Sequence, residues 1–264
     1  MKKYYLLVLL LLSYAGNSFA QSKHLLTVTP VQYDKNADAD NTPPNTLSAK
    51  EKKAGFQLLF NGKNLSGWRS VMKTTAPEKG WEVIDGSLHV LDSAHGGKSG
   101  DLLTSGNFRS FELVFDFKIT EGANSGVKYF VTESSQASKA GLGLEFQVLD
   151  DEHHADAKFG TEGNRKMGSL YDLIPATQEP KAQRQPGEWN HGRIVVYPNN
   201  LVQHWLNGYK LVEYERGGNA FRVLVAHSKY AKQKDFGLSE SGPILLQDHG
   251  NSVFFRSIKI REIK

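Results

Sequence analysis

The sequence contains no cysteine. This absence excludes disulfide bridges, thiol nucleophiles and cysteine-based metal sites, so the folded part must be held together by a hydrophobic core. A bacterial lipoprotein needs a cysteine at the cleavage point of its leader, so lipid anchoring by that route is excluded as well.

Long apolar runs and basic clusters are also missing. No segment beyond the N-terminus approaches the roughly 20 apolar residues of a transmembrane helix. The formal net charge of +4 falls to +2 without Lys2 and Lys3, and no cluster of five or more basic residues occurs, which argues against nucleic acid as a partner. The sequence has no phosphate-binding loop, dinucleotide-binding glycine motif or serine nucleophile elbow.

The first twenty residues have the pattern of a secretory signal peptide. Lys2 and Lys3 precede an apolar run over residues 6–12, and small residues lead to Ala20. This pattern predicts cleavage after about Ala20 and an exported protein without a membrane span.

Beyond the leader, the composition predicts two parts. Residues 21–54 are polar and include Pro43 and Pro44, as in a linker or a loosely packed arm. Residues 55–264, about 210 in number, are enough for one large core and predict a single domain.

Short alternating segments dominate residues 55–264 and predict strands. Asp85-Gly86 and Asn207-Gly208 lie between such segments and are typical of tight hairpins. Only residues 220–231 show a weak helical period. Many strands without crossover helices predict an all-β antiparallel sandwich or jelly roll. The predicted strands cover residues 56–60, 81–84, 87–91, 111–119, 126–131, 142–149, 193–197, 201–206, 209–214, 244–247 and 253–263.

The strand predicted over residues 142–149 places two polar side chains on one face. Leu144, Phe146 and Val148 alternate with Glu145 and Gln147. The two polar residues stand about 7 Å apart along the strand, a suitable spacing for binding one small polar ligand. Glu145 is therefore a candidate catalytic carboxylate and Gln147 a candidate substrate-binding residue.

Asn124 and Lys128 belong to the preceding predicted strand. Asn124-Ser-Gly126 can serve as a turn or contribute Asn124 to a binding site. Lys128 is out of phase with Val127 and Tyr129, so it can reach the same polar face as Glu145. The alternative is a solvated lysine.

Five polar residues follow directly, Asp150-Asp-Glu-His-His154. Asp150 and His153 are candidates for proton transfer or metal binding, and a solvated loop is the alternative. The spacing is not that of a known metal motif, because contiguous loop residues point in divergent directions. A divalent metal is left open and no other cofactor is expected.

Aromatic residues offer further candidates. Trp189 can stack on a sugar ring or lie in the core, and Tyr171 can supply a phenolic acid or anchor a long loop. His204 is in phase with Val202 and Leu206, which favours a core or edge histidine.

The segment over residues 243–260 reads as a hairpin whose tip carries Gln247, Asp248 and His249. Gly250-Asn251 already supplies a turn, so these side chains call for a separate explanation. Period-two alternation places Arg256 on the face of Phe254, Ile258 and Ile260, where a guanidinium needs a partner. We therefore expect Glu145, Gln147, His249 and Arg256 to surround one pocket.

Several motifs occur together in one order, and together they resemble the 3-keto-disaccharide hydrolase family, also described as 3-keto-glucoside lyase and hydratase domains. The resemblance covers essentially all of residues 55–264. In place of the aromatic and arginine that the family often has after Asn-Ser-Gly, this chain has Tyr129-Phe130 and offers Lys128. The motifs are Phe56-Gln-Leu-Leu-Phe-Asn-Gly-Lys-Asn-Leu-Ser-Gly-Trp68, Trp81-Glu-Val-Ile-Asp-Gly86, Asn124-Ser-Gly126, Glu145-Phe-Gln147, Gly187-Glu-Trp-Asn190, His204-Trp-Leu-Asn-Gly208 and Leu246-Gln-Asp-His-Gly250.

The resemblance implies a concanavalin-like jelly roll, a periplasmic location and action on glycosides oxidised to a ketone at sugar C3. It also implies a functional link to a sugar 3-oxidoreductase. The ketone makes the C2 proton acidic, so the site needs a base, a group that stabilises the enolate oxygen, and an acid near the leaving group. The residues leave the roles open. Base candidates are Glu145, Asp150 and Asp151, enolate candidates are Lys128 and Arg256, and acid candidates are His153, His249 and Tyr171.

Three other functions remain open at this point. A lectin-like module would bind unoxidised glycans and change none of them. A two-carboxylate glycosidase would use Glu145 with Asp150 or Asp151. A purely structural or interaction protein is the third.

Overall fold

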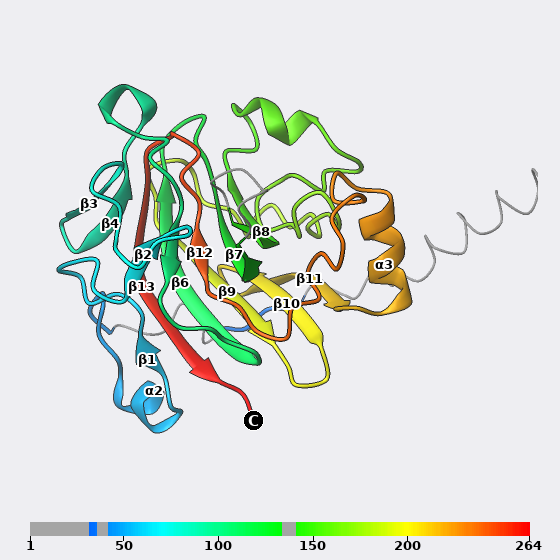
Figure 1. The fold of residues 1–264 in the computed structure, drawn as a ribbon, viewed down its shortest axis with the longest axis horizontal. Coiled ribbons are helices and arrows are strands. Elements are labelled where there is room, and N and C mark those ends of the chain that lie inside the picture. The colour runs from blue at the N-terminus through cyan, green and yellow to red at the C-terminus, as the bar shows by residue number, and fades with distance from the viewer. Residues whose placement is uncertain (1–31, 36–41, 134–140) are drawn as a thin grey trace, which may run out of the picture. The chain divides into compact units, whose positions relative to one another are not determined.

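The strand β6 (Phe111–Ile119) shows how the sequence pattern builds the core. Its five odd-numbered residues are large and apolar, and each is at most 1% exposed, while Glu112, Asp116 and Lys118 point to the other face. The computed structural model, which describes residues 32–35, 42–133 and 141–264, places this apolar face between two antiparallel sheets (Figure 1). The predicted signal peptide lies outside the described residues.

The larger sheet has eight strands in the order β11-β10-β9-β6-β13-β4-β3, with β1 also paired to β13. All its described pairs are antiparallel. Besides β6, its strands are β1 (Gln57–Leu58), β3 (Trp81–Ile84), β4 (Ser87–Val90), β9 (Asn190–Val196), β10 (Leu201–Leu206), β11 (Tyr209–Glu215) and β13 (Val253–Glu262).

The smaller sheet has five antiparallel strands in the order β2-β5-β12-β7-β8. They are β2 (Trp68–Ser70), β5 (Leu102–Thr104), β7 (Asn124–Thr132), β8 (Leu142–Leu149) and β12 (Leu245–Leu246). The two-sheet antiparallel sandwich confirms the predicted concanavalin-like jelly roll.

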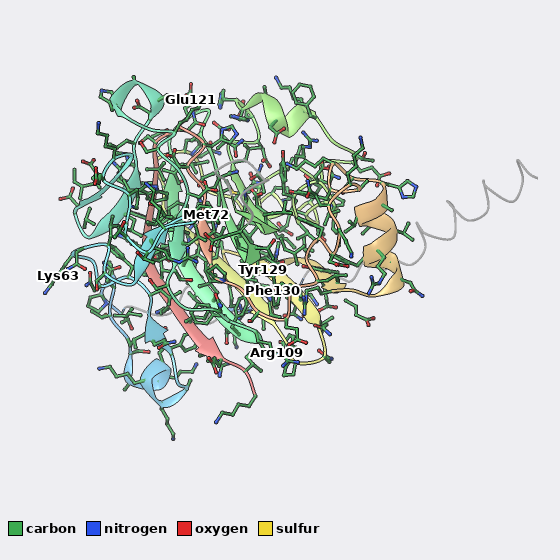
Figure 2. The ribbon with its side chains drawn as sticks, in the orientation of Figure 1. Lys63, Met72, Arg109, Glu121, Tyr129 and Phe130 are labelled. Carbon is green, nitrogen blue, oxygen red and sulfur yellow. The ribbon has the colours of Figure 1, made fainter. Side chains whose placement is uncertain are left out.

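Aromatic rings from both sheets meet in the core. Phe115 of β6 meets Phe146 of β8 at right angles, with ring centroids 5.5 Å apart, and Phe111 meets Tyr129 of β7 edge to face at 6.3 Å. Tyr129 and the adjacent Phe130, both labelled in Figure 2, are at most 1% exposed. Phe130 adopts a φ of 52°, so it turns inward beside Tyr129 and leaves the face of Lys128.

The predicted strands over residues 111–119, 142–149 and 201–206 coincide with β6, β8 and β10, and both predicted tight hairpins are present. Asp85 and Asn207 adopt the positive φ angles, 49° and 47°, that these turns require. The weak helical period corresponds to α3 (Asn219–Ala226), whose Phe221 stacks on Tyr214.

The predicted hairpin over residues 243–260 is wrong. β12 lies in the smaller sheet and β13 in the larger one, so the intervening residues cross between sheets. Asp248 organises this crossing, because its carboxylate accepts hydrogen bonds from the backbone N–H groups of Lys98, Ser99, Gly100 and Gly250.

The predicted face of Arg256 is also wrong. A bulge between Arg256 and Lys259, with Ser257 at a φ of 51°, breaks the period-two alternation. Phe255 and Ile258 therefore both point into the core, whereas Arg256 lies on the outer face of the larger sheet.

Part of the predicted arm packs on the domain. The short helix α2 (Ala49–Lys53) begins with a capping box between Ser48 and Glu51, and Glu51 forms an ion pair with the buried Lys259. Asn45 accepts a hydrogen bond from the Ser257 backbone N–H and donates one to the Gly86 carbonyl. Two short 3₁₀ helices, η1 (Ser93–His95) and η2 (Ala155–Lys158), lie in loops.

Among the described residues, no helix combines the length and the apolar character needed to cross a membrane.

Candidate functional site

A polar pocket of about 530 Å³ lies on the face of the smaller sheet that points away from the core. Its floor comes from β7 and β8, where Lys128 pairs in register with Glu145 and Gly126 with Gln147. Cross-strand partners share a face, so the alternation that buries Phe146 in the core turns Glu145 and Gln147 toward the pocket. The volume is within the range of roughly 300–1,000 Å³ typical of small-molecule sites.

Glu145 is the one carboxylate among the described residues that line this pocket. It is 4% exposed, and its Oε2 lies 3.9 Å from Nζ of Lys128, which is 8% exposed. Burial raises the pKa of Glu145, while Lys128 and then Lys229 act in the opposite direction. The site therefore holds a carboxylate that binds a proton more readily than an exposed one.

Gly126 makes room for that carboxylate. A Cβ atom at this position would overlap Oε1 of Glu145. The glycine is therefore required for space, since its φ is not positive.

Amide side chains line the pocket beside Glu145. Gln147 and Gln247 lie on either side of Gly126, and Asn124 lies on its strand two residues away. Asn124 is 4% exposed, and its Oδ1 accepts no hydrogen bond from any described residue. Since a buried polar atom without a partner is costly, this oxygen is available to a ligand hydroxyl.

Tyr171 enters the pocket from a segment that pairs with the edge of β8. Its hydroxyl donates to Oδ2 of Asp156 at 2.8 Å, and Arg165 binds both Asp156 and Asp172 at 2.9 and 2.7 Å. Burial and then the bond to Asp156 raise the pKa of Tyr171. With its proton held by Asp156, the phenol offers a ligand its oxygen lone pairs.

Three lining residues with polar side chains were not predicted from the sequence: Lys229, Tyr230 and Gln233. They follow α3 in a segment rich in lysine, at and beyond the end of the weak helical period over residues 220–231, and that pattern does not distinguish them from solvated residues. Tyr230 stacks on Phe236 with centroids 3.8 Å apart, which fixes this segment against the domain.

His249 reaches the pocket rim from the crossing that Asp248 organises. Its ring meets that of His154 nearly at right angles, at a centroid distance of 5.9 Å. Desolvation by the surrounding walls, with His154 and Lys98 nearby, lowers the pKa of His249.

Asp150 and His153 do not line the pocket. The Asp150 carboxylate binds the backbone N–H groups of Gly122, Glu152 and His153 and also the His153 ring, 2.8 Å away. These contacts make Asp150 an organiser of its own loop. Asp151 likewise accepts from the Met167 backbone and from Gln183, outside the pocket.

Trp189 and Arg256 lie together on the outer face of the larger sheet. The guanidinium stacks on the indole at 3.9 Å and contacts Asp116 at 3.4 Å. The expectation that Arg256 would share a pocket with Glu145, Gln147 and His249 is therefore wrong for Arg256, because β13 belongs to the larger sheet and the pocket lies on the outer face of the smaller one. The structure does bring the other three together.

Within the described ranges, no three histidine, aspartate or glutamate side chains gather as a metal-ligand set. The polar groups that line the pocket are one carboxylate, amides, lysines and an imidazole. This combination is suited to hydrogen bonding with a polar, uncharged ligand.

Comparisons with known proteins identify the family of the chain. Residues 55–261 match a family model described as the 3-keto-alpha-glucoside-1,2-lyase-like domain. A protein named 3-keto-disaccharide hydrolase, from Bacteroides thetaiotaomicron, is 32% identical over 265 residues, covering 92% of this chain and 89% of the relative.

Two crystal structures of candidate glycosyl hydrolases from Parabacteroides distasonis share the fold. One is 32% identical with a TM-score of 0.73, covering 84% of this chain and 100% of that one. The other is 28% identical with a TM-score of 0.58, covering 79% of this chain and 99% of that one.

Proposed function

Because the chain belongs to the family of 3-keto-alpha-glucoside-1,2-lyase-like domains, we propose that it cleaves 3-keto-glycosides by removing the C2 proton and expelling the C1 substituent. Family membership and the named relative support a carbohydrate-active enzyme. The buried Glu145–Lys128 pair on the pocket floor is the observation that carries the proposal.

Glu145 is the proposed base. Its carboxylate takes the proton from C2, the C–H electron pair forms a C2–C3 double bond, and the carbonyl π electrons move to the C3 oxygen to form an enolate. The raised pKa of Glu145 suits this step, because a base is most effective when its pKa approaches the working pH. Once Glu145 is protonated, the Lys128 ammonium no longer faces a carboxylate. It then stabilises the negative charge on the C3 oxygen.

Departure of the C1 substituent completes the elimination. The enolate re-forms the carbonyl, a C1–C2 double bond forms, and the C1–O bond breaks. We assign protonation of the departing oxygen to His249 in its charged form, because the Tyr171 proton is held by Asp156. Asn124, Gln147 and Gln247 bind sugar hydroxyls in this arrangement.

Hydration of the resulting 2-hydroxy-3-keto-glucal reuses the same groups in reverse. Water adds at C1 and the proton on Glu145 returns to C2, so the two steps together amount to hydrolysis. The substrate arises by oxidation of a sugar at C3, so the proposal includes a functional link to a sugar 3-oxidoreductase. The predicted leader supports a periplasmic location.

Two-carboxylate hydrolysis of unoxidised glycosides is disfavoured. That mechanism needs a second carboxyl group facing the scissile bond. Glu145 stands alone among the described lining carboxylates, and Asp150 and Asp151 are engaged elsewhere.

The test uses purified protein and a nitrophenyl 3-keto-glucoside, following the enone absorbance and the released nitrophenol. Both should rise with the wild type, and Glu145→Gln should reduce turnover by at least about 100-fold. The same glucoside without the ketone is the control and should remain intact. Absence of both products with the wild type would contradict the proposal, and saturable binding of the unoxidised glucoside would then favour a lectin-like module.

A further inference from the structure

Lys229 presents a positive charge to the pocket without a close ion pair among the described residues. It lines the cavity together with Glu145 and Tyr171 and is exposed at the cavity mouth. No carboxylate oxygen of the described residues lies within 4.0 Å of its Nζ, in contrast to Lys128 beside Glu145. Its close contacts are aromatic, since Nζ lies 4.0 Å from the ring centroid of Tyr171 and 5.1 Å from that of Tyr230.

The aromatic contacts hold the ammonium while leaving it free to bind. A ring face attracts a cation but uses none of its three N–H groups in conventional hydrogen bonds. Desolvation lowers the pKa of Lys229, and Glu145 and Asp172 act against that shift. The amine can thus donate to a ligand that covers the mouth.

The segment carrying Lys229 is fixed by a chain of charged groups behind the pocket. The Lys229 backbone N–H donates to Oδ2 of Asp172 at 2.9 Å, and Asp172 in turn binds Arg165. Arg165 also binds Asp156, which holds the Tyr171 hydroxyl. The guanidinium of Arg165 therefore links Asp172, which holds the Lys229 backbone, to Asp156, which holds the Tyr171 hydroxyl.

The proposed reaction moves negative charge away from the group that Lys128 faces in the resting site. Lys128 compensates Glu145 in the resting site, and the proton transfer moves that negative charge onto the C3 oxygen. A second cation, already in place and without a carboxylate within 4.0 Å among the described residues, strengthens this transfer without first breaking an ion pair.

We propose that Lys229 is a second catalytic cation, which donates a hydrogen bond to the C3 oxygen as the enolate forms. It takes the role for which the sequence offered Arg256 as one candidate. This inference rests on the proposed function.

The experiment compares Lys229→Met and Lys229→Arg with the matched control Lys232→Met, which removes an exposed lysine of the same segment that does not line the pocket. Two rates are measured for each protein: nitrophenol release from the 3-keto-glucoside, and exchange of the C2 hydrogen of methyl 3-keto-glucoside for deuterium, followed by NMR. Exchange reports proton abstraction independently of the leaving group. Thermal unfolding checks that each variant is folded.

We expect Lys229→Met to lower kcat and C2 exchange by about 10²- to 10³-fold, the usual effect of removing one donor to a developing oxyanion. Lys229→Arg keeps the charge and should recover part of both rates, and Lys232→Met should match the wild type. A folded Lys229→Met with kcat within about threefold of the wild type, or with only a raised KM, overturns the inference and leaves the proposed function standing. A wild-type protein that shows neither nitrophenol release nor C2 exchange would contradict both this inference and the proposed function.

Discussion

The ammonium of Lys128 and the carboxylate of Glu145 lie 3.9 Å apart and belong to residues paired in register across β7 and β8. Both side chains are nearly inaccessible, and both arise from paired strands of the smaller sheet. Their separation is therefore fixed by backbone hydrogen bonds rather than by a loop, which is the condition for a pre-organised site.

Glu145→Gln should stabilise the folded protein near pH 7. Burial raises the pKa of Glu145 despite Lys128, so the ionised form costs folding free energy above that pKa. Glutamine keeps the shape without the charge. The melting temperature of the variant should exceed that of the wild type at pH 7, and the difference should shrink toward pH 4, where glutamate is protonated in both states. A lower melting temperature at pH 7 would mean that the ion pair outweighs burial.

Gly126→Ala should impair turnover while the fold remains intact. The new methyl group overlaps Oε1 of Glu145 and displaces the carboxylate, and a shift of about 1 Å at a reacting group can cost about 10²-fold in rate. Steady-state kinetics on the 3-keto-glucoside measure this effect. Gly106→Ala is the matched control, because a Cβ there meets only Phe108 at 3.7 Å and lies outside the pocket. Equal rates for both variants would show that Glu145 tolerates displacement.

The pH dependence of turnover should be a narrow bell. Activity rises with pH as Glu145 loses its proton, at a pKa above the usual carboxyl range. It falls at higher pH as His249 loses its proton, at a pKa below the ordinary imidazole value. The raised pKa of Glu145 and the lowered pKa of His249 bring the acidic and the basic limb of the pH profile closer together. A profile of kcat/KM against pH tests this, and His249→Ala should lower the rate and remove the upper limb. An unchanged upper limb would assign it to another group.

Stability should decrease in mild acid because of His204. This ring is fully buried, accepts from the Tyr129 hydroxyl at 2.9 Å and donates to the Gly168 carbonyl at 3.1 Å. Burial lowers the pKa of His204 from 6.5 to about 4, so the unfolded chain binds a proton more readily. The contribution of neutral His204 to the free energy of unfolding is complete above about pH 7, and it declines by about 3 kcal/mol as pH falls to about 4.

Urea unfolding of the wild type and His204→Gln at pH 7 and pH 4.5 measures this contribution. The variant should lose less stability between the two pH values than the wild type. Equal losses would mean that other groups dominate the acid response.

The sequence predicted the strands whose side chains alternate over six or more residues, and with them the placement of Glu145 and Gln147. It missed β2 and β5, because three residues are too few to show a period. Lys128 lies on the polar face, as predicted. Strict alternation would place Phe130 beside it, but the bulge at Phe130 turns that ring into the core.

Other misassignments have local causes. Gly250 and Asn251 suit a hairpin and a crossing between sheets equally well, since turn residues specify a change of direction and not the next strand partner. The Ser257 bulge leaves no period-two signature, so Arg256 was assigned to the wrong face. Lys229 sits among other lysines in an irregular segment, and only tertiary contacts bring it beside Glu145.

The packing of Asn45 and Glu51 on β13 sets a lower bound on the length of chain that folds well. A polypeptide trimmed to the family-matched residues 55–261 would lose the partners of the Ser257 N–H and the Gly86 carbonyl. It would also lose Glu51, the ion-pair partner of Lys259. Contacts that hold the domain therefore extend upstream of the segment that matches the family, so recombinant forms should retain Asn45 and Glu51.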